Sequence, residues 1–313
     1  MAGHSSLKVV FAALAGNTLI AVTKFGAAAY TGSSAMLSEA IHSLVDTGNQ
    51  GLLLFGIKRA ARPADAEHPF GYAREIYFWS FVVAILIFAV GSGVSIYEGI
   101  QKIIHPHPIT SPVVNYIVLG LALVFEGAAW WIAYNEFNKT KGKKGLFESI
   151  HKSKDPTIFT VLFEDTAAIL GLAVAVIGIA CTDYFGLEMA DGIASVIIGF
   201  ILAGAAILLA YETKGLLIGE AASDELVAGV QEIVSLAKNV EHLNELRTMH
   251  MGPDDVLLAL SLDYRDGLTS QRIEDCNYEL EKAIKLRFPQ IKRLYLEVQS
   301  QDHHEEAEMT LEQ

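Results

Sequence analysis

Long apolar stretches dominate the first two thirds of the chain, and short polar segments separate them. A helix needs about 20 residues to cross roughly 30 Å of hydrocarbon. Six stretches approach or exceed this length, at residues 7–30, 34–57, 76–100, 112–137, 156–180 and 189–211. Because lipid offers the backbone no hydrogen-bond partner, spans of this length are expected to be helical. The pattern predicts an α-helical membrane protein with six transmembrane helices.

After Gly219 the pattern becomes that of a water-soluble domain. Ser223 is a predicted N-cap of an amphipathic helix, and Thr269 is a predicted N-cap of a second helix that ends at Phe288. Alternation of apolar and polar residues predicts two strands and, less regularly, a third. These strands are expected near residues 243–251, 255–264 and 294–298. The order of elements is therefore α-β-β-α-β.

Three regions follow from these patterns. Residues 1–218 are predicted to form the six-helix transmembrane domain, and residues 219–300 a small cytoplasmic α+β domain. Residues 301–313 are polar and acidic, and we expect them to be a disordered tail.

Composition agrees with two parts in different solvents. Of the 313 residues, 52% are hydrophobic and only 19% are charged, whereas soluble domains carry about 25% charged residues. From Glu220 onward, acidic residues outnumber basic ones by 20 to 9, so this part holds −11 of the net charge of −13. We expect no nucleic-acid partner. Cys181 and Cys276 lie far apart in the sequence and predict neither a disulfide framework nor a thiolate zinc site.

Basic residues in the short loops predict the orientation. Lys58, Arg59, Arg62 and Arg74 join the second and third spans, and six lysines between residues 139 and 154 join the fourth and fifth. Lys102 is the sole basic residue in a loop of the opposite side. The positive-inside rule then places both termini in the cytoplasm. The expected location is the bacterial inner (plasma) membrane.

Ionisable residues inside a span are costly and usually functional. The second span contains Glu39, His42 and Asp46, and the spacing of four residues places His42 and Asp46 on one helix face. Imidazole and carboxylate are zinc ligands, and the fifth span offers further carboxylates at Glu164 and Asp165. Two alternatives stay open. His42 and Asp46 could be a packing pair, and the two acids could be solvated near the helix end.

Two other acids lie within the predicted spans. Glu98, near the end of the third span, and Glu126, in the fourth, could relay protons or hydrogen bond to a neighbouring helix.

Several motifs together resemble the cation diffusion facilitator family over nearly the whole chain. They are Asn17 and Lys24, Thr31-Gly-Ser-Ser34, the HxxxD of His42 and Asp46, the loop from Arg62 to Glu75, and Asp191-Gly-Ile-Ala-Ser195. The sequence Glu164-Asp-Thr166 resembles the branch of mitochondrial-type zinc transporters. The resemblance implies a homodimeric exporter of divalent metal ions, with zinc as the first candidate. Protons would move in the opposite direction by alternating access.

The resemblance also implies a central site of His42, Asp46 and Asp165. The family commonly has a histidine four residues before the last of these, where this chain has Val161. Either Glu164 or water is then the fourth ligand. No cofactor is expected beyond the transported ion, which is Zn²⁺ or, alternatively, Mn²⁺, Fe²⁺ or Co²⁺.

Other metal sites of the family are weaker here. Asp65 and His68 are retained in the loop after the second span, but Tyr72 stands at the third position, so a weak second site or a contact of this loop with the membrane or the C-terminal domain is expected. Asn244, Leu296 and Val298 stand where the resemblance leads us to expect ligands of the C-terminal domain. That domain is expected to serve dimerisation.

Two functions of other classes remain as alternatives to a transporter. One is a scaffold subunit that transports nothing. The other is an intramembrane metallohydrolase, for which the sequence shows neither a general base nor a substrate cleft.

Overall fold

The computed structural model describes residues 3–140, 154 and 156–311. The chain forms two compact units, one of Met1–Ala61 with Glu75–Lys214 and one of Arg62–Arg74 with Gly215–Gln313. The second unit differs from the predicted C-terminal domain because it includes the loop Arg62–Arg74, which the sequence pattern assigned to the membrane domain.

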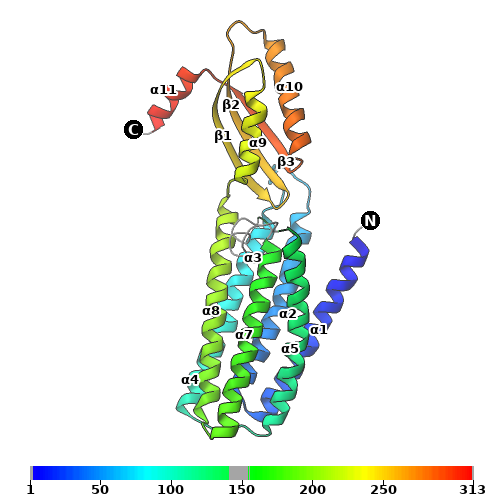
Figure 1. The fold of residues 1–313 in the computed structure, drawn as a ribbon, viewed down its shortest axis with the longest axis vertical. Coiled ribbons are helices and arrows are strands. Elements are labelled where there is room, and N and C mark those ends of the chain that lie inside the picture. Colours follow the sequence, from blue (N-terminus) through cyan, green and yellow to red (C-terminus); the bar gives the residue numbers. More distant parts are fainter. Residues whose placement is uncertain (1–2, 141–153, 155, 312–313) are drawn as a thin grey trace. The chain divides into compact units, whose positions relative to one another are not determined.

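The first unit is a bundle of long helices (Figure 1). They are α1 (Gly3–Thr31), α2 (Ser34–Ala60), a continuous helix made of α3 (Glu75–Leu86), the π-helical η1 (Ile87–Ser92) and α4 (Gly93–Ile104), then α5 (Pro112–Thr140), α7 (Pro156–Phe185) and α8 (Met189–Ile218). Among the described residues, four segments are long and apolar enough to cross a membrane, at 75–104, 112–132, 159–185 and 189–218. α1 and α2 are not in this set, and in α2 the ionisable residues lower the hydropathy. Most of the lysine-rich stretch at 139–154 lies outside the described residues.

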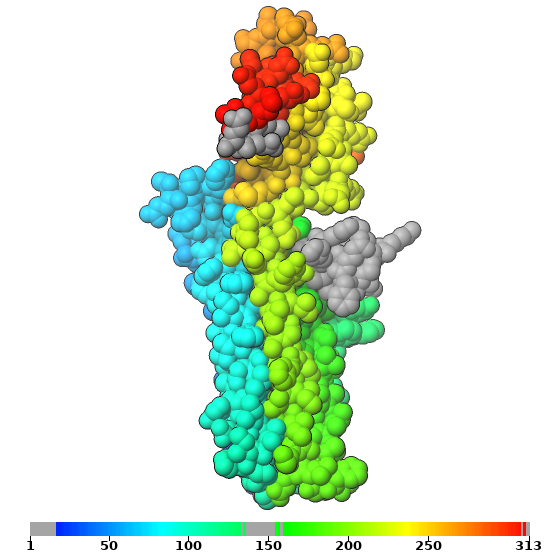
Figure 2. All heavy atoms as spheres, turned by 90° about the vertical axis from the view of Figure 1, so that its left-hand side faces the viewer, coloured from blue at the N-terminus to red at the C-terminus, as the bar shows by residue number. Residues whose placement is uncertain are grey.

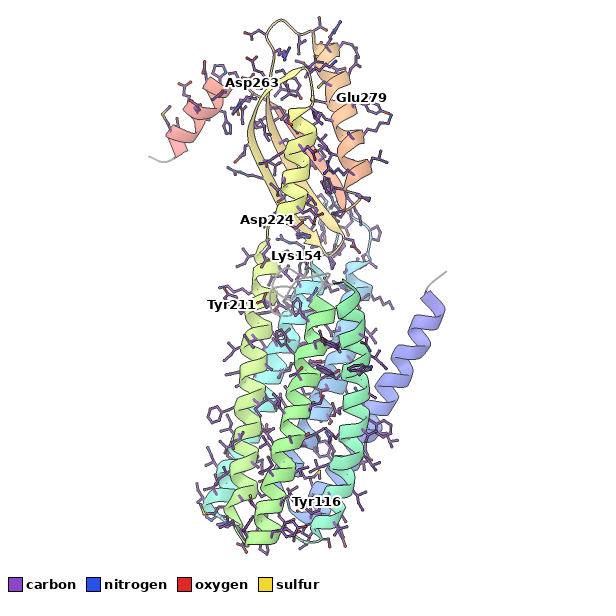
Figure 3. The ribbon with its side chains drawn as sticks, viewed as in Figure 1. Tyr116, Lys154, Tyr211, Asp224, Asp263 and Glu279 are labelled. Atoms are coloured by element: carbon purple, nitrogen blue, oxygen red, sulfur yellow. The ribbon has the colours of Figure 1, made fainter. Side chains whose placement is uncertain are left out.

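Large apolar side chains cover the outside of this bundle. Phe88 on η1, Phe125 on α5 and Phe200 on α8 are 51%, 58% and 65% exposed. Tyr211 on α8 also projects away from the bundle (Figure 3). Apolar exposure of this extent marks a contact surface, and together with the apolar spans it indicates contact with lipid.

Glycines bring the α3–η1–α4 helix and α8 close together. A Cβ atom at Gly99 would lie 2.6 Å from the Gly192 carbonyl oxygen, and one at Gly199 would lie 3.1 Å from that of Ser92. Such small residues allow helices in membranes to pack backbone against backbone. The two helices run side by side along the face shown in Figure 2.

The second unit contains α9 (Asp224–Ser235), β1 (Val240–Gly252), β2 (Asp255–Tyr264), α10 (Ser270–Arg287), β3 (Ile291–Val298) and α11 (Gln301–Leu311). β2 is the middle strand, antiparallel to β1 and parallel to β3, with α10 as the crossover. Alternate residues of β2 from Val256 to Tyr264 form one core with α9 and α10. The predicted order α-β-β-α-β and the N-caps Ser223 and Thr269 are confirmed.

The expectation of a disordered tail was wrong for residues 301–311, which form α11. Its start is fixed by specific bonds: the Gln301 N–H donates to Asp263 Oδ2 at 3.1 Å, and His304 Nδ1 lies 3.0 Å from Gln299 Oε1. The segment is polar, but Glu, Gln, Met and Leu are favourable helix residues. Polarity alone therefore did not indicate disorder.

One arginine holds the loop Arg62–Arg74 within the second unit. The Arg293 guanidinium donates to both carboxylate oxygens of Asp255, at 2.6 and 2.7 Å, and to the Phe70 carbonyl oxygen at 2.7 Å. Asp255 is 8% exposed. The loop is thus fastened to the sheet through a charge-assisted bond.

We expect Arg293→Ala to loosen this loop without unfolding the helical bundle. Hydrogen bonds to charged groups contribute about 1.5–3 kcal/mol, so amide exchange at residues 65–72 should become roughly tenfold faster or more. Hydrogen exchange measured by mass spectrometry on the full chain tests this. Arg287→Ala is the matched control, because Arg287 pairs with the exposed Glu232. If amides 65–72 exchange equally slowly in both variants, Arg293 does not hold the loop on the sheet.

Candidate metal site

A small cavity lies among α1, α2, α5 and α7, at the place where the sequence predicts metal ligands. It has a volume of ≈ 20 Å³, which is room for about one water molecule. The lining residues are Asn17, Ile20, Ser43, Asp46, Gln50, Glu126, Val161, Glu164 and Asp165. The structure therefore brings Asp46 of the second predicted span together with Glu164 and Asp165 of the fifth, whereas Glu39 and His42 do not line the cavity.

Several buried polar atoms near this cavity make no hydrogen bond. They are both ring nitrogens of His42, Oδ1 of Asp46 and Oδ2 of Asp165. His42 Nδ1 lies 3.4 Å from Asp46 Oδ1, which is close enough for an ion pair, although the pair does not form a hydrogen bond. Buried polar atoms are nearly always paired, so each exception needs an explanation. These histidine and aspartate atoms belong to residue types that ligate zinc, and Oδ1 of the neighbouring Asn49 also makes no hydrogen bond.

Glu164 has a protein partner. Its Oε1 accepts a hydrogen bond of 2.8 Å from Asn49 Nδ2 on α2, and the residue is 6% exposed. Glu164 is thus buried between helices and not solvated at a helix end. Asn49 was not singled out from the sequence, since an amide in a polar run carries no specific signal.

The predicted ligands share a region but are not arranged as a metal-ion cage. Within the part of the chain that the structure describes, no group of three His, Cys, Asp or Glu side chains stands in position to hold one ion. Coordination by His42, Asp46 and Asp165 therefore requires the side chains to rearrange around the ion.

The two candidate proton relays lie in different places. Glu126 lines the cavity described above. Glu98 lines a separate cavity of ≈ 210 Å³ together with Ser34, Gln101, Lys102, His105 and His107. In that second cavity Lys102 Nζ lies 2.6 Å from His107 Nδ1.

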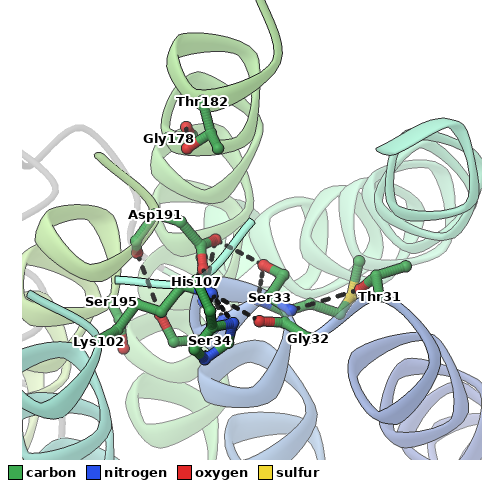
Figure 4. Close-up of polar contacts among 12 residues, drawn as sticks. Thr31, Gly32, Ser33, Ser34, Lys102, His107, Gly178, Thr182, Asp191 and Ser195 are labelled. Atoms are coloured by element: carbon green, nitrogen blue, oxygen red, sulfur yellow. Dashed lines mark hydrogen bonds and ion pairs between the residues drawn. The ribbon is translucent and has the colours of Figure 1, made fainter. Parts of the chain in front are cut away.

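A buried carboxylate anchors the beginning of α2 (Figure 4). Asp191, at the start of α8, accepts hydrogen bonds from Ser33 Oγ at 2.5 Å and from Ser34 N at 2.7 Å, and Lys102 Nζ lies 3.9 Å away. A negative charge at a helix N-terminus stabilises the helix. This contact fixes the helix that carries His42. Its role was missed in the sequence, where Asp191 was noted only as part of a family motif.

Asp65 and His68 lie in the second unit. The Asp65 carboxylate already accepts bonds from the Tyr72 hydroxyl at 2.6 Å and from the His68 N–H at 2.8 Å. The Tyr72 bond is the main reason why the pKa of Asp65 lies below its usual range. Asp65 thus stabilises this loop when ionised, and its contribution is lost as the pH falls through the lowered pKa. These bonds favour a role in the turn, because a metal ion would have to displace them.

Comparison with known proteins identifies the class. Residues 10–218 match the cation efflux transmembrane domain. The chain belongs to the cation efflux family and is an integral membrane protein. The resemblance seen in the sequence is confirmed, and the expectation of a transporter and not an enzyme agrees with this family.

Three curated relatives show how similar this chain is to members of the family. It is 33% identical to the human "Proton-coupled zinc antiporter SLC30A9, mitochondrial" over 90% of this chain and 51% of the relative. It is 30% identical to "Metal tolerance protein C4" of Arabidopsis thaliana over 85% of this chain and 59% of the relative. It is 27% identical to the cation-efflux pump FieF of Cronobacter sakazakii over 87% of this chain and 85% of the relative.

The chain spans about half the length of its SLC30A9 relatives. A solved MamM CTD structure covers 25% of this chain and 96% of its own, with 13% identity and a TM-score of 0.23, a likeness too slight to support a conclusion. The names of the mitochondrial relatives give no support to the expected bacterial inner membrane.

Proposed function

We propose that this protein exports divalent metal ions, with zinc as the principal substrate, in exchange for protons. The observation that carries the proposal is that Asp46 and Asp165 line one small cavity, that His42 pairs with Asp46, and that each of the three has a buried polar atom without a hydrogen bond. After the side chains rearrange, a divalent cation would take one ring nitrogen of His42 and a carboxylate oxygen from each of Asp46 and Asp165 as ligands. The names of the SLC30A9 relatives, which include both zinc and proton coupling, support the same substrate pair.

We assign His42, Asp46 and Asp165 as ligands of the transported ion, with Glu164 as the fourth ligand or in direct support of it. Metal ligands must lose their protons to bind. Metal and proton occupancy therefore oppose each other at this site, which is the chemical basis of exchange. Glu98 and Glu126 stay predictions as proton relays, and Asp65 with His68 stays a prediction of a weak second metal site.

A second candidate substrate is a harder ion such as Mn²⁺, Fe²⁺ or Co²⁺. The cavity is lined by the carboxylates of Asp46, Glu164 and Asp165, and oxygen-rich sites suit such ions. His42 is the feature that favours zinc.

The proposal includes six transmembrane helices, with α1 and α2 added to the four apolar spans. Both termini and the basic loops would face the cytoplasm or a topologically equivalent compartment. The second unit would serve dimerisation of two identical chains.

Reconstituted vesicles test the function and its rivals together. Purified full-length protein in proteoliposomes should transport zinc faster than manganese, cobalt or iron(II). Transport of a harder ion in preference to zinc would favour the second candidate. Absence of flux for all four ions would contradict export and leave the scaffold or metallohydrolase.

A further inference from the structure

A lysine is fully buried inside the helical bundle. Lys24, on α1, is 0% exposed, and its Nζ lies 3.2 Å from Glu39 Oε2, 2.8 Å from Ser43 Oγ and 3.3 Å from Glu126 Oε1. An ammonium group in such a place is tolerated only when it is paired. The three partners come from α2 and α5, so Lys24 joins three helices.

The partners of Lys24 reach the metal cavity. Ser43 and Glu126 bond to Lys24 and also line the cavity that contains Asp46 and Asp165. Glu126 therefore stands between the ammonium group and the site of the ion. It is 14% exposed, whereas Glu39 is 0% exposed.

Glu39, by contrast, is confined away from the cavity. Its Oε1 makes no hydrogen bond and lies against α7 at Gly171, where an added Cβ atom would collide with this oxygen. Glu39 also does not appear among the residues that line the cavity. The carboxylate that Lys24 withholds from the ion is thus Glu126.

We propose that Lys24 is a positioning residue that keeps Glu126 out of the ion's coordination sphere and so limits how tightly the site binds its substrate. This inference rests on the proposed metal site. Without the ammonium group the cavity would offer four carboxylates, those of Asp46, Glu126, Glu164 and Asp165. The number of charged ligands tunes metal affinity.

A limit on affinity suits a transporter. An ion must bind well enough to enter but weakly enough to leave. A fourth carboxylate would hold the divalent ion more tightly and slow its release. A purely structural role for Lys24 predicts something different, namely loss of folded protein with no gain in affinity.

The test removes the ammonium group of Lys24 together with the negative charge of its buried partner Glu39. We expect Lys24→Met with Glu39→Gln to bind zinc roughly tenfold more tightly, at the lower end of the range by which groups around metal ligands change affinity. Zinc flux at saturation should fall. Adding Glu126→Gln should return the affinity to the wild-type value. Zinc titration of the full chain in detergent and flux in vesicles give the two readouts, and Thr23→Ala, which alters the neighbouring residue of α1, is the control.

Unchanged or weaker zinc binding in the paired variant, Lys24→Met with Glu39→Gln, would overturn the inference. Tighter binding that persists after Glu126→Gln is added would also overturn it. If the paired variant does not fold, Glu126→Gln alone decides. It should weaken zinc binding by less than about threefold, whereas loss of metal-site support costs about 10–100-fold, and a loss of that size would make Glu126 a ligand. If the wild type itself binds no zinc, it is the proposed function that fails.

Discussion

Replacing Asp46 or Asp165 with alanine is expected to abolish metal transport while the protein still folds and assembles. Each change deletes one of the carboxylates that line the cavity and that have a buried oxygen without a hydrogen bond. Neither of these two oxygens makes a hydrogen bond, so their removal breaks none, although Asp46→Ala also removes the ion pair of 3.4 Å with His42. Zinc flux in vesicles measures the loss, and chromatography of the purified variants measures assembly.

Asp183→Ala provides the matched control for these variants. Asp183 also lies on α7, but its carboxylate accepts a bond of 3.4 Å from the Tyr116 hydroxyl of α5, near the end of the bundle (Figure 3). This control should transport at close to the wild-type rate. Loss of a metal ligand should lower transport far below the wild-type rate. If either variant keeps more than about half of that rate, the residue it replaces is not a ligand.

The second large effect concerns Glu164. We expect Glu164→Gln to weaken zinc binding roughly 10–100-fold, the range for losing important support of a metal site. The amide keeps the size of the side chain but removes the charge from a position beside Asp165. The hydrogen bond from Asn49 holds this carboxylate between α2 and α7, within reach of the cavity. Zinc titration of the purified variant gives the affinity.

A compensating variant tests the role of Glu164 by supplying a different ligand in its place. Val161 lines the cavity one helical turn before Asp165. Val161→His combined with Glu164→Gln should restore zinc binding and shift the preference toward zinc over manganese, since imidazole suits the softer ion. If both variants bind zinc and manganese as the wild type does, water and not Glu164 completes the ion's coordination.

Local patterns in the sequence were sufficient for much of the fold. Ser223 and Thr269 were recognised as N-caps because their hydroxyls serve backbone N–H groups only three residues ahead. The alternation in residues 255–264 predicted β2 correctly, because one face of that strand is buried. The spacing of His42 and Asp46 likewise placed both residues on one face of a helix.

Contacts between distant segments could not be read from the sequence. Lys24 meets Glu126 across 102 residues, and Ser33 meets Asp191 across 158. No periodicity relates such pairs, so their partners appear only when the helices pack. The attachment of the loop Arg62–Arg74 to the second unit through Arg293 is of the same kind.

Zinc flux under an imposed pH gradient tests the central claim most directly. Wild-type protein is reconstituted into vesicles with an acidic lumen, zinc is added outside, and lumenal zinc and pH are followed together. Proton exchange at the site of His42, Asp46 and Asp165 predicts that the gradient accelerates zinc uptake, that the lumen becomes less acidic as zinc enters, and that Asp46→Ala shows neither effect. Zinc uptake that is indifferent to the gradient, or that persists in Asp46→Ala, would contradict it.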